Sequence, residues 1–106
     1  MSNKVKDEII KFNKERDWDQ FHSENNIAKS IMIEAGELLE CFQFDKDHYD
    51  KQAVKEELAD VVNYCYVLAD RMGVDLDEIV LEKLEKNKLK YPVEKAKGKS
   101  TKYDKL

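Results

Sequence analysis

Hydrophobic residues recur at helical spacing along most of the chain. Apolar side chains three or four positions apart lie on one face of a helix. This pattern predicts helices over residues 3–16, 24–44, 51–72 and 75–90. Pro92 ends the last of them, because proline cannot continue the hydrogen-bond ladder of a helix. We therefore expect an all-α fold, a helical bundle of four main helices joined by short loops.

Polar residues and glycines mark the ends of these predicted helices. Ser23 and Asp75 precede the second and fourth helices, and their side chains can accept hydrogen bonds from the first turn. Gly73 stands where the third helix should end, in a position that favours left-handed backbone. Residues 45–50 are mostly polar and predict a loop. Gly36, inside the apolar second helix, suggests that another segment approaches the backbone closely there.

The composition describes one small domain. A chain of 106 residues can bury only a modest core, and 3 glycines and 1 proline argue against a turn-rich sandwich. No apolar run reaches the roughly 20 residues that cross a bilayer, and no apolar signal core opens the chain. Cys41 and Cys65 fit free thiols in a reducing compartment. We expect a cytoplasmic protein without membrane contact, with a helical domain over residues 1–92 and a lysine-rich tail over 93–106 that is extended or disordered.

The net charge of −4 is unevenly distributed. Residues 1–80 carry 10 lysines and arginines against 19 acids, whereas residues 81–106 carry 9 lysines against 4 acids. A basic end on an acidic body could meet nucleic acid, a membrane, phosphates or the protein's own acidic surface, or could simply be solvated. Few aromatic residues lie among these lysines and the whole chain is acidic, so we do not expect nucleic-acid binding.

Two acidic doublets carry the most informative chemistry. Glu34 and Glu37 are three residues apart in the second predicted helix, and Glu57 and Asp60 in the third. Residues at this spacing share a helix face, and apolar neighbours place both pairs at the edge of the core. Converging ionised carboxylates repel one another unless a cation compensates them. Mg²⁺, or Mn²⁺ in its place, is the usual partner of an all-oxygen site and commonly also binds substrate phosphates.

Other interpretations of these acids follow from the same spacing. Surface ion pairs with Lys29, Lys51 or Lys55 are equally compatible with it. A di-iron bundle would need Glu-x-x-His on two helices, but His22 and His48 fall in predicted loops. Neither cysteine has a histidine nearby in sequence, and no glycine-rich phosphate loop is present. A metal site and surface ion pairs therefore both remain open on spacing alone.

A longer pattern resembles the MazG-like nucleotide pyrophosphohydrolases, and within them the dCTP pyrophosphatase branch. The doublets match the ExxE…ExxD pattern of that family. Five segments carry the resemblance, in the family's order: ERDWDQFH (15–22), EAGEL (34–38), CFQF (41–44), ELADV (57–61) and NKLKYP (87–92). Together they span roughly residues 10–92, and this combination is far more specific than either doublet alone.

The resemblance implies an all-α fold assembled as a homodimer or homotetramer. It also implies Mg²⁺-dependent conversion of a nucleoside triphosphate, such as dCTP or a modified nucleotide, to the monophosphate and pyrophosphate, a house-cleaning activity on nucleotide pools. The four acids Glu34, Glu37, Glu57 and Asp60 would be the catalytic metal ligands. Which of them accepts the proton of the attacking water is left open.

The resemblance also implies a nucleotide pocket. Its base-binding residues would be Trp18, Phe44, Tyr64 and His22. Its phosphate-binding residues would be Asn26, Lys83, Asn87, Lys88, Lys90 and Tyr91. Two departures leave the choice of base open, because many relatives have Pro-Lys near Glu24 and Asn25, and often Trp where this chain has Phe44.

One alternative belongs to another class of protein. The chain could be a non-catalytic helical interaction protein that binds a partner through its basic C-terminal end. The complete set of four acids favours the enzyme, because a scaffold has no physical need for clustered carboxylates.

Overall fold

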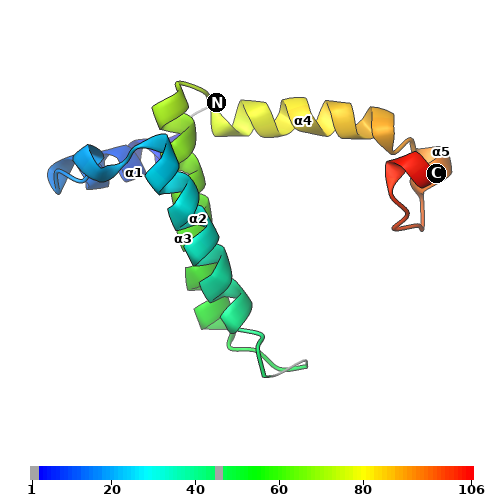
Figure 1. Cartoon of the computed structure of the whole chain (residues 1–106), viewed down its shortest axis with the longest axis horizontal. Coiled ribbons are helices and arrows are strands. Elements are labelled where there is room, and N and C mark those ends of the chain that lie inside the picture. The colour runs from blue at the N-terminus through cyan, green and yellow to red at the C-terminus, as the bar shows by residue number, and fades with distance from the viewer. Residues whose placement is uncertain (1–2, 45–46) are drawn as a thin grey trace. The chain divides into compact units, whose positions relative to one another are not determined.

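The computed structural model describes residues 3–44 and 47–106, and these are helical without any strand (Figure 1). The main helices are α1 (Lys4–Glu15), α2 (Glu24–Glu40), α3 (Lys51–Met72) and α4 (Leu76–Lys90). The shorter elements are the 3₁₀ turn η1 (Asp19–Phe21), the helix α5 (Val93–Ala96) and the 3₁₀ turn η2 (Tyr103–Lys105). The prediction of an all-α fold with four main helices is confirmed.

Helix α2 is shorter than the predicted 24–44. The backbone N–H groups of residues 41, 42 and 43 donate to the carbonyls three residues earlier, at 3.0–3.2 Å. Such bonds tighten the end of a helix into 3₁₀ geometry. Phe44 consequently lies beyond the helix. Of the loop predicted over residues 45–50, residues 45 and 46 lie outside the described part, and the others are not helical.

The predicted end signals act as expected at three helix boundaries. The Asn26 N–H donates to Ser23 Oγ at 3.2 Å, and the Glu78 N–H donates to Asp75 Oδ1 at 3.0 Å. Gly73 ends α3 in the left-handed conformation, with φ of 71°. These contacts satisfy backbone groups that have no partner within the helix itself.

The chain divides into two compact units, Met1–Val74 and Asp75–Leu106. In the first unit, α2 lies along α3 and α1 also packs on α3 (Figure 1). The buried apolar residues are Ile27, Val67 and Ala69, with Ile27 only 1% exposed. The pairing of α2 with α3 is what brings the two acidic doublets face to face. The single domain over residues 1–92 stays a prediction.

The second unit contains α4 and the C-terminal segment. The Tyr91 and Tyr103 rings meet edge to face with centroids 6.1 Å apart, and Lys90 Nζ lies 4.8 Å from the Tyr103 ring centroid. The short elements α5 and η2 fold residues of the predicted tail back towards the end of α4. The assignment of residues 93–106 as a separate tail stays a prediction. No helix among the described residues has the length and apolar character needed to span a membrane.

Asp50 provides a test of the local signals that begin α3. Its Oδ1 accepts from the backbone N–H groups of Gln52 at 3.0 Å and Ala53 at 3.2 Å. We expect Asp50→Ala to lower the free energy of unfolding by about 1 kcal/mol, because the cap is lost. Urea denaturation at one fixed protein concentration measures this change. Asp50→Asn is the matched control, since asparagine caps almost as well, and an equal loss in both variants would refute the capping role.

Candidate active site

The antiparallel neighbours α2 and α3 bring three of the predicted metal ligands together. Carboxylate oxygens of Glu34, Glu37 and Glu57 all lie within 4.8 Å of one another. Asp60 stands one turn beyond Glu57 on α3, and its charge acts on both Glu34 and Glu57. The four acids predicted from sequence therefore form one cluster in space, which we call the acidic cluster.

The pKa values of two residues in the acidic cluster are raised, by burial and by the repulsion between ionised carboxylates at this spacing. Burial is the largest cause that raises the pKa of Glu34 to about 7, followed by a proton shared with Glu37 and by the charges of Glu37, Asp60 and Glu57. Burial, again with Glu37 and the neighbouring charges, raises the pKa of Glu57 above its usual value. One oxygen of Glu34 and one of Glu57 are buried without a hydrogen-bond partner in the described part of the chain.

A divalent cation fits this donor set. Within residues 3–44 and 47–106, no lysine or arginine pairs with the acidic cluster, so the alternative of ion pairs with Lys29, Lys51 or Lys55 is not seen there. Unpaired, half-buried carboxylates are costly unless a cation compensates them. Oxygen-only donors suit Mg²⁺ or Mn²⁺.

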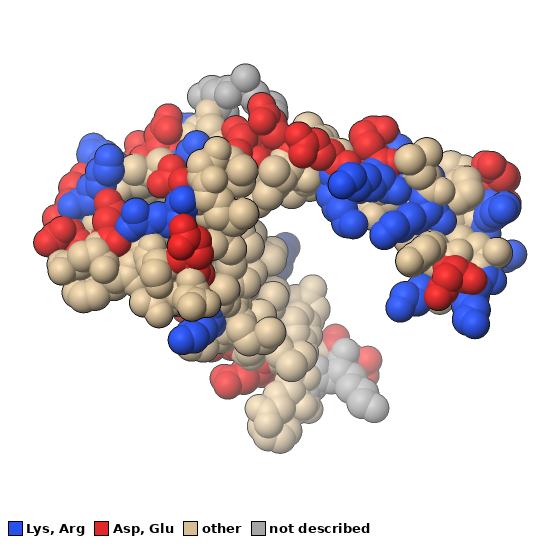
Figure 2. Space-filling view, turned by 45° about the horizontal axis from the view of Figure 1, so that its top comes forward, with Lys and Arg blue, Asp and Glu red and all other residues tan. Residues whose placement is uncertain are grey.

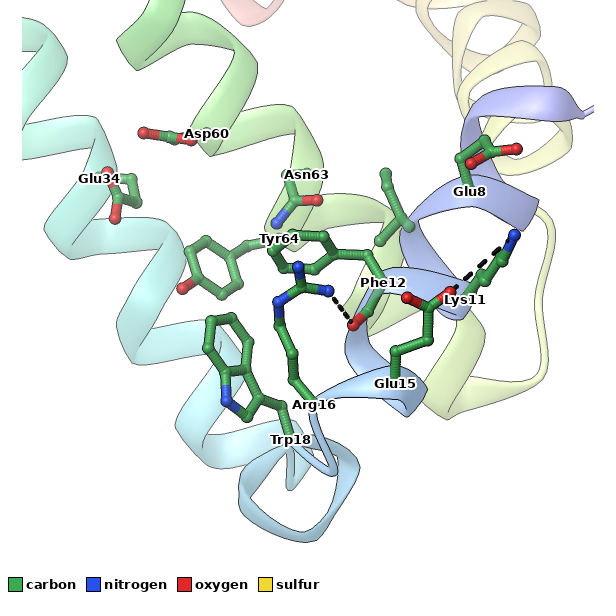
Figure 3. A pocket seen from close by; sticks show the side chains of 11 residues that line it. Glu8, Lys11, Phe12, Glu15, Arg16, Trp18, Glu34, Asp60, Asn63 and Tyr64 are labelled. Carbon is green, nitrogen blue, oxygen red and sulfur yellow. Dashed lines mark hydrogen bonds and ion pairs between the residues drawn. The ribbon is translucent and has the colours of Figure 1, made fainter.

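A cavity of about 690 Å³ adjoins the acidic cluster. Glu34 and Asp60 lie in its lining, and the rings of Phe12, Trp18 and Tyr64 form an aromatic wall (Figure 3). Phe12 and Trp18 meet edge to face with centroids 5.5 Å apart. Burial raises the pKa of Tyr64, and so do the charges of the acids, Glu34 first among them. The aromatic wall and the acidic cluster thus share one cavity.

The turn after α1 fixes the position of Trp18. Asp17 adopts left-handed backbone with φ of 55°, its N–H donates to the Lys14 carbonyl at 3.1 Å, and the Trp18 N–H donates to the Asn13 carbonyl at 3.0 Å. This pair of bonds is a Schellman motif, which ends a helix with a defined change of direction. Trp18, which is 42% exposed, is therefore held against the cavity by backbone geometry as well as by its contact with Phe12.

Sequence reasoning named Trp18, Glu34, Asp60 and Tyr64 but missed the other residues of this lining, among them Phe12, Arg16 and Asn63. The Arg16 guanidinium lies 3.8 Å from the Phe12 ring centroid and donates to the Phe12 carbonyl at 3.0 Å. The available signals were weak. Phe12 reads as an ordinary core residue, whereas Asn63 is a polar residue within an apolar stretch of α3.

Three other predicted residues lie elsewhere in the first unit and do not line the cavity. His22 is half-buried with Nδ1 unpaired among the described atoms, and its pKa is lowered, mainly by burial. Asn26 donates its amide to the Phe21 carbonyl at 3.0 Å, which braces the turn before α2. Phe44 is 93% exposed. Binding roles for these residues stay predictions.

The remaining predicted phosphate-binding residues all belong to the second unit. They are Lys83, Asn87, Lys88, Lys90 and Tyr91. Figure 2 shows lysine side chains gathered over this unit. Lys83, Asn87 and Lys90 share one face of α4 by their spacing, while Lys88 Nζ pairs with Glu85 Oε1 at 2.8 Å.

Comparisons with known proteins agree with this geometry. The family model described as "MazG-like" matches residues 29–106. dCTP pyrophosphatase 1 from Mus musculus is 38% identical over 104 residues, and the Homo sapiens protein of that name is 39% identical over 104 residues. These matches cover 90% of this chain, which spans 61% of the length of either relative. The crystal structure of a pyrophosphatase from Archaeoglobus fulgidus superposes with a TM-score of 0.77 and 38% identity, covering 83% of this chain and 89% of that one.

The raised pKa of Glu34 predicts a pH-dependent stability in the absence of divalent metal. Its pKa is about 7 in the folded protein against 4.5 ordinarily, so between these values the folded state binds more protons than the unfolded state. The free energy of unfolding should then fall as pH rises through this window. In the presence of a chelator, we expect the melting temperature of the wild type to be lower at about pH 8 than at about pH 5.5. This decrease should be larger than the decrease measured for Glu34→Gln over the same pH range.

Two single substitutions on α2 test this prediction. Glu34→Gln should flatten the pH dependence of the melting temperature, whereas Glu40→Gln, at an exposed position, should retain it. Mg²⁺ added at the higher pH should raise the melting temperature of the wild type. If the melting temperature of Glu34→Gln depended on pH as steeply as that of the wild type, the pH dependence would not arise from Glu34.

Proposed function

We propose that this chain, which belongs to the MazG-like family, is a Mg²⁺-dependent nucleoside triphosphate pyrophosphohydrolase. It converts a (deoxy)nucleoside triphosphate, with dCTP or a modified nucleotide as first candidates, to the monophosphate and pyrophosphate. The observation that carries this proposal is the acidic cluster at the edge of an aromatic cavity, in which Glu34, Glu37 and Glu57 hold oxygens within 4.8 Å of one another. The names of its relatives support the reaction.

Glu34, Glu37, Glu57 and Asp60 are the proposed ligands of Mg²⁺, which Mn²⁺ could replace. When bound, the metal neutralises phosphate charge and lowers the pKa of water. The acidic cluster holds unpaired carboxylate oxygens ready for this ion, since two of them are buried without a hydrogen-bond partner among the described residues.

The cavity orients the nucleotide for attack. Trp18 and Tyr64 offer flat faces on which a base can stack, and Glu34 and Asp60 lie in the same lining. A nucleotide with its base on the aromatic wall therefore directs its phosphates towards the acidic cluster. Water forms a bond to the α-phosphorus, the bond to the bridging oxygen breaks, and pyrophosphate leaves. A carboxylate of the cluster accepts the proton of the water.

Phosphate binding involves cations beyond the acidic cluster. Lysine is a suitable point charge for phosphate, and the last two turns of α4 carry several lysines. The proposed phosphate-binding set is Asn26, Lys83, Asn87, Lys88, Lys90 and Tyr91. His22 and Phe44 complete the proposed base-binding set, which rests for these two residues on the family resemblance alone.

A second copy of the chain is the proposed partner, in a homodimer or homotetramer. Met32, Gly36 and Leu39 share a face of α2, and the two apolar side chains are 73% and 71% exposed. A side chain added at Gly36 would meet nothing within 4 Å, so no described residue of the chain makes the close approach expected at this glycine. Exposed apolar side chains that share one helix face support the proposal that this face takes part in self-association.

A cytoplasmic location accompanies this function. Cys41 and Cys65 are free thiols, as is usual in a reducing compartment.

The rival function, a non-catalytic partner-binding protein, predicts no need for the acidic cluster. Thermal melting with Mg²⁺ and a non-hydrolysable nucleotide separates the two, because a bound ligand raises the melting temperature.

Glu37→Gln is the sharpest test of the reaction. The swap keeps the shape of the side chain but removes a ligand's charge. We expect pyrophosphate release from the best standard nucleoside triphosphate to fall at least about 100-fold, since loss of outer-shell partners alone costs about 10- to 100-fold. Glu40→Gln, on the same helix but outside the cluster, should stay near wild type. Release of orthophosphate would contradict attack at the α-phosphorus, and no release from standard or modified nucleotides would favour the rival function.

Met32→Glu tests the proposed self-association. A charge placed on the exposed apolar face of α2 should split the oligomer, because a carboxylate is costly to bury in an apolar interface. Size-exclusion chromatography with light scattering should show a smaller mass than for the wild type. Met32→Leu keeps the apolar character and should keep the mass. Equal masses for the wild type and Met32→Glu would refute a role for this face.

A further inference from the structure

Asn63 is a polar residue in the cavity wall whose presence the fold does not explain. It lies on α3 between Val62 and Tyr64, is half-buried, and lines the cavity. Its amide makes no hydrogen bond to any residue within 3–44 or 47–106. Asparagine is a poor helix former, and the amide atoms of Asn63 are not among the buried polar atoms, so they are open to the cavity. A ligand in the cavity would give these donors and acceptor a partner.

Asn63 lies between a carboxylate and an aromatic ring of the cavity lining. Asp60 precedes it by three residues on the same face of α3, and Tyr64 follows it directly. Figure 3 shows the Asn63 side chain directed into the cavity beside Tyr64 and Phe12. A base stacked on the aromatic wall would therefore present its edge to this amide.

Few side chains of the cavity lining can form matched hydrogen bonds with the edge of a nucleobase. Aromatic faces stack on any base and do not distinguish one from another. Apart from the aromatic rings and Ile9, the lining side chains other than Asn63 are charged. The amide of asparagine offers an acceptor and two donors, and pairs in bidentate fashion with a base that carries an amino group beside a ring nitrogen.

We propose that Asn63 is a specificity-determining residue of this cavity, whose amide pairs with a base that carries an amino group beside a ring nitrogen, as cytosine does. The negative charge of Asp60, one turn away, attracts the NH₂ end of the amide and leaves Oδ1 free to accept from the amino group of the base. A base with a carbonyl in that position, such as uracil, would face Oδ1 with an acceptor. This role rests on the proposed function, because it takes the cavity as the nucleotide site.

Trp18 provides a direct measurement of base binding. It is the sole tryptophan of the chain and lines the cavity, so a stacked base should change its fluorescence. We would titrate non-hydrolysable α,β-methylene analogues of dCTP and dUTP, with Mg²⁺, into the wild type, Asn63→Leu and Gln52→Leu. Gln52 is the matched control, an exposed amide on the same helix outside the cavity lining.

The expected result is selective. The wild type should bind the dCTP analogue more tightly than the dUTP analogue. Asn63→Leu should weaken the dCTP analogue about 10- to 100-fold and change the dUTP analogue less than about threefold, because only the matched hydrogen bonds are lost. Gln52→Leu should match the wild type. Asn63→Ala, which removes the amide without adding a charge, replaces Asn63→Leu if that variant fails to fold.

Each contrary outcome has its own meaning. An equal loss for both analogues would make Asn63 a support of the cavity, and no loss, or a wild-type preference for the dUTP analogue, would overturn its proposed role. Pyrophosphate release together with equal binding of the two analogues would support the proposed function and refute the specificity role of Asn63. Selective binding of the dCTP analogue without any pyrophosphate release would support the role of Asn63 and refute the proposed function. No fluorescence change with either analogue in the wild type would overturn the role of Asn63.

Discussion

Repulsion among the carboxylates between α2 and α3 is the constraint on which the rest of the structure depends. Glu34, Glu37 and Glu57 hold oxygens within 4.8 Å of one another, and the chain places no lysine or arginine against them in its described part. Carboxylates in this position weaken the packing of the very helices that carry them. The folded state relieves the strain by retaining a proton, which is why the pKa of Glu34 rises to about 7. A bound divalent cation would relieve it without that proton.

The same constraint accounts for the modest core. Acidic residues occupy positions along the α2–α3 contact where a stable two-helix pair would place apolar side chains. The buried apolar residues, Ile27, Val67 and Ala69, lie away from the acids, while Met32 and Leu39 remain exposed. A small domain that gives up apolar contacts for a charged site needs stabilisation from elsewhere. The exposed face of α2 supplies the surface for it, and a metal at the acids would contribute further.

Helix α1 and the turn that follows it convert the acidic cluster into a shaped site. The Schellman motif at Asp17 directs Trp18 towards Tyr64, and Arg16 stacks on Phe12 behind them. The carboxylates of Glu34 and Asp60 therefore share one cavity lining with aromatic faces. This combination matches the two chemistries of a nucleotide, a polyanion that metal and carboxylates can hold and a flat base, and Asn63 adds an uncharged polar group to the same lining.

The sequence by itself determined the helices and the acidic doublets. Periodicity and the end signals at Ser23, Gly73 and Asp75 are local properties, and side chains three residues apart share a helix face whatever surrounds them. The end of α2 was missed because Phe42 continues the apolar spacing while the backbone has already changed to 3₁₀ hydrogen bonds.

Only the tertiary structure decided which residues meet. It joined the two doublets into one cluster, placed Trp18 and Tyr64 on one cavity wall, left Phe44 exposed, and added Phe12, Arg16 and Asn63 to the lining. Such meetings depend on how α1 and α2 pack on α3, and packing between helices is set by contacts far apart in sequence. No local pattern of residues records those contacts.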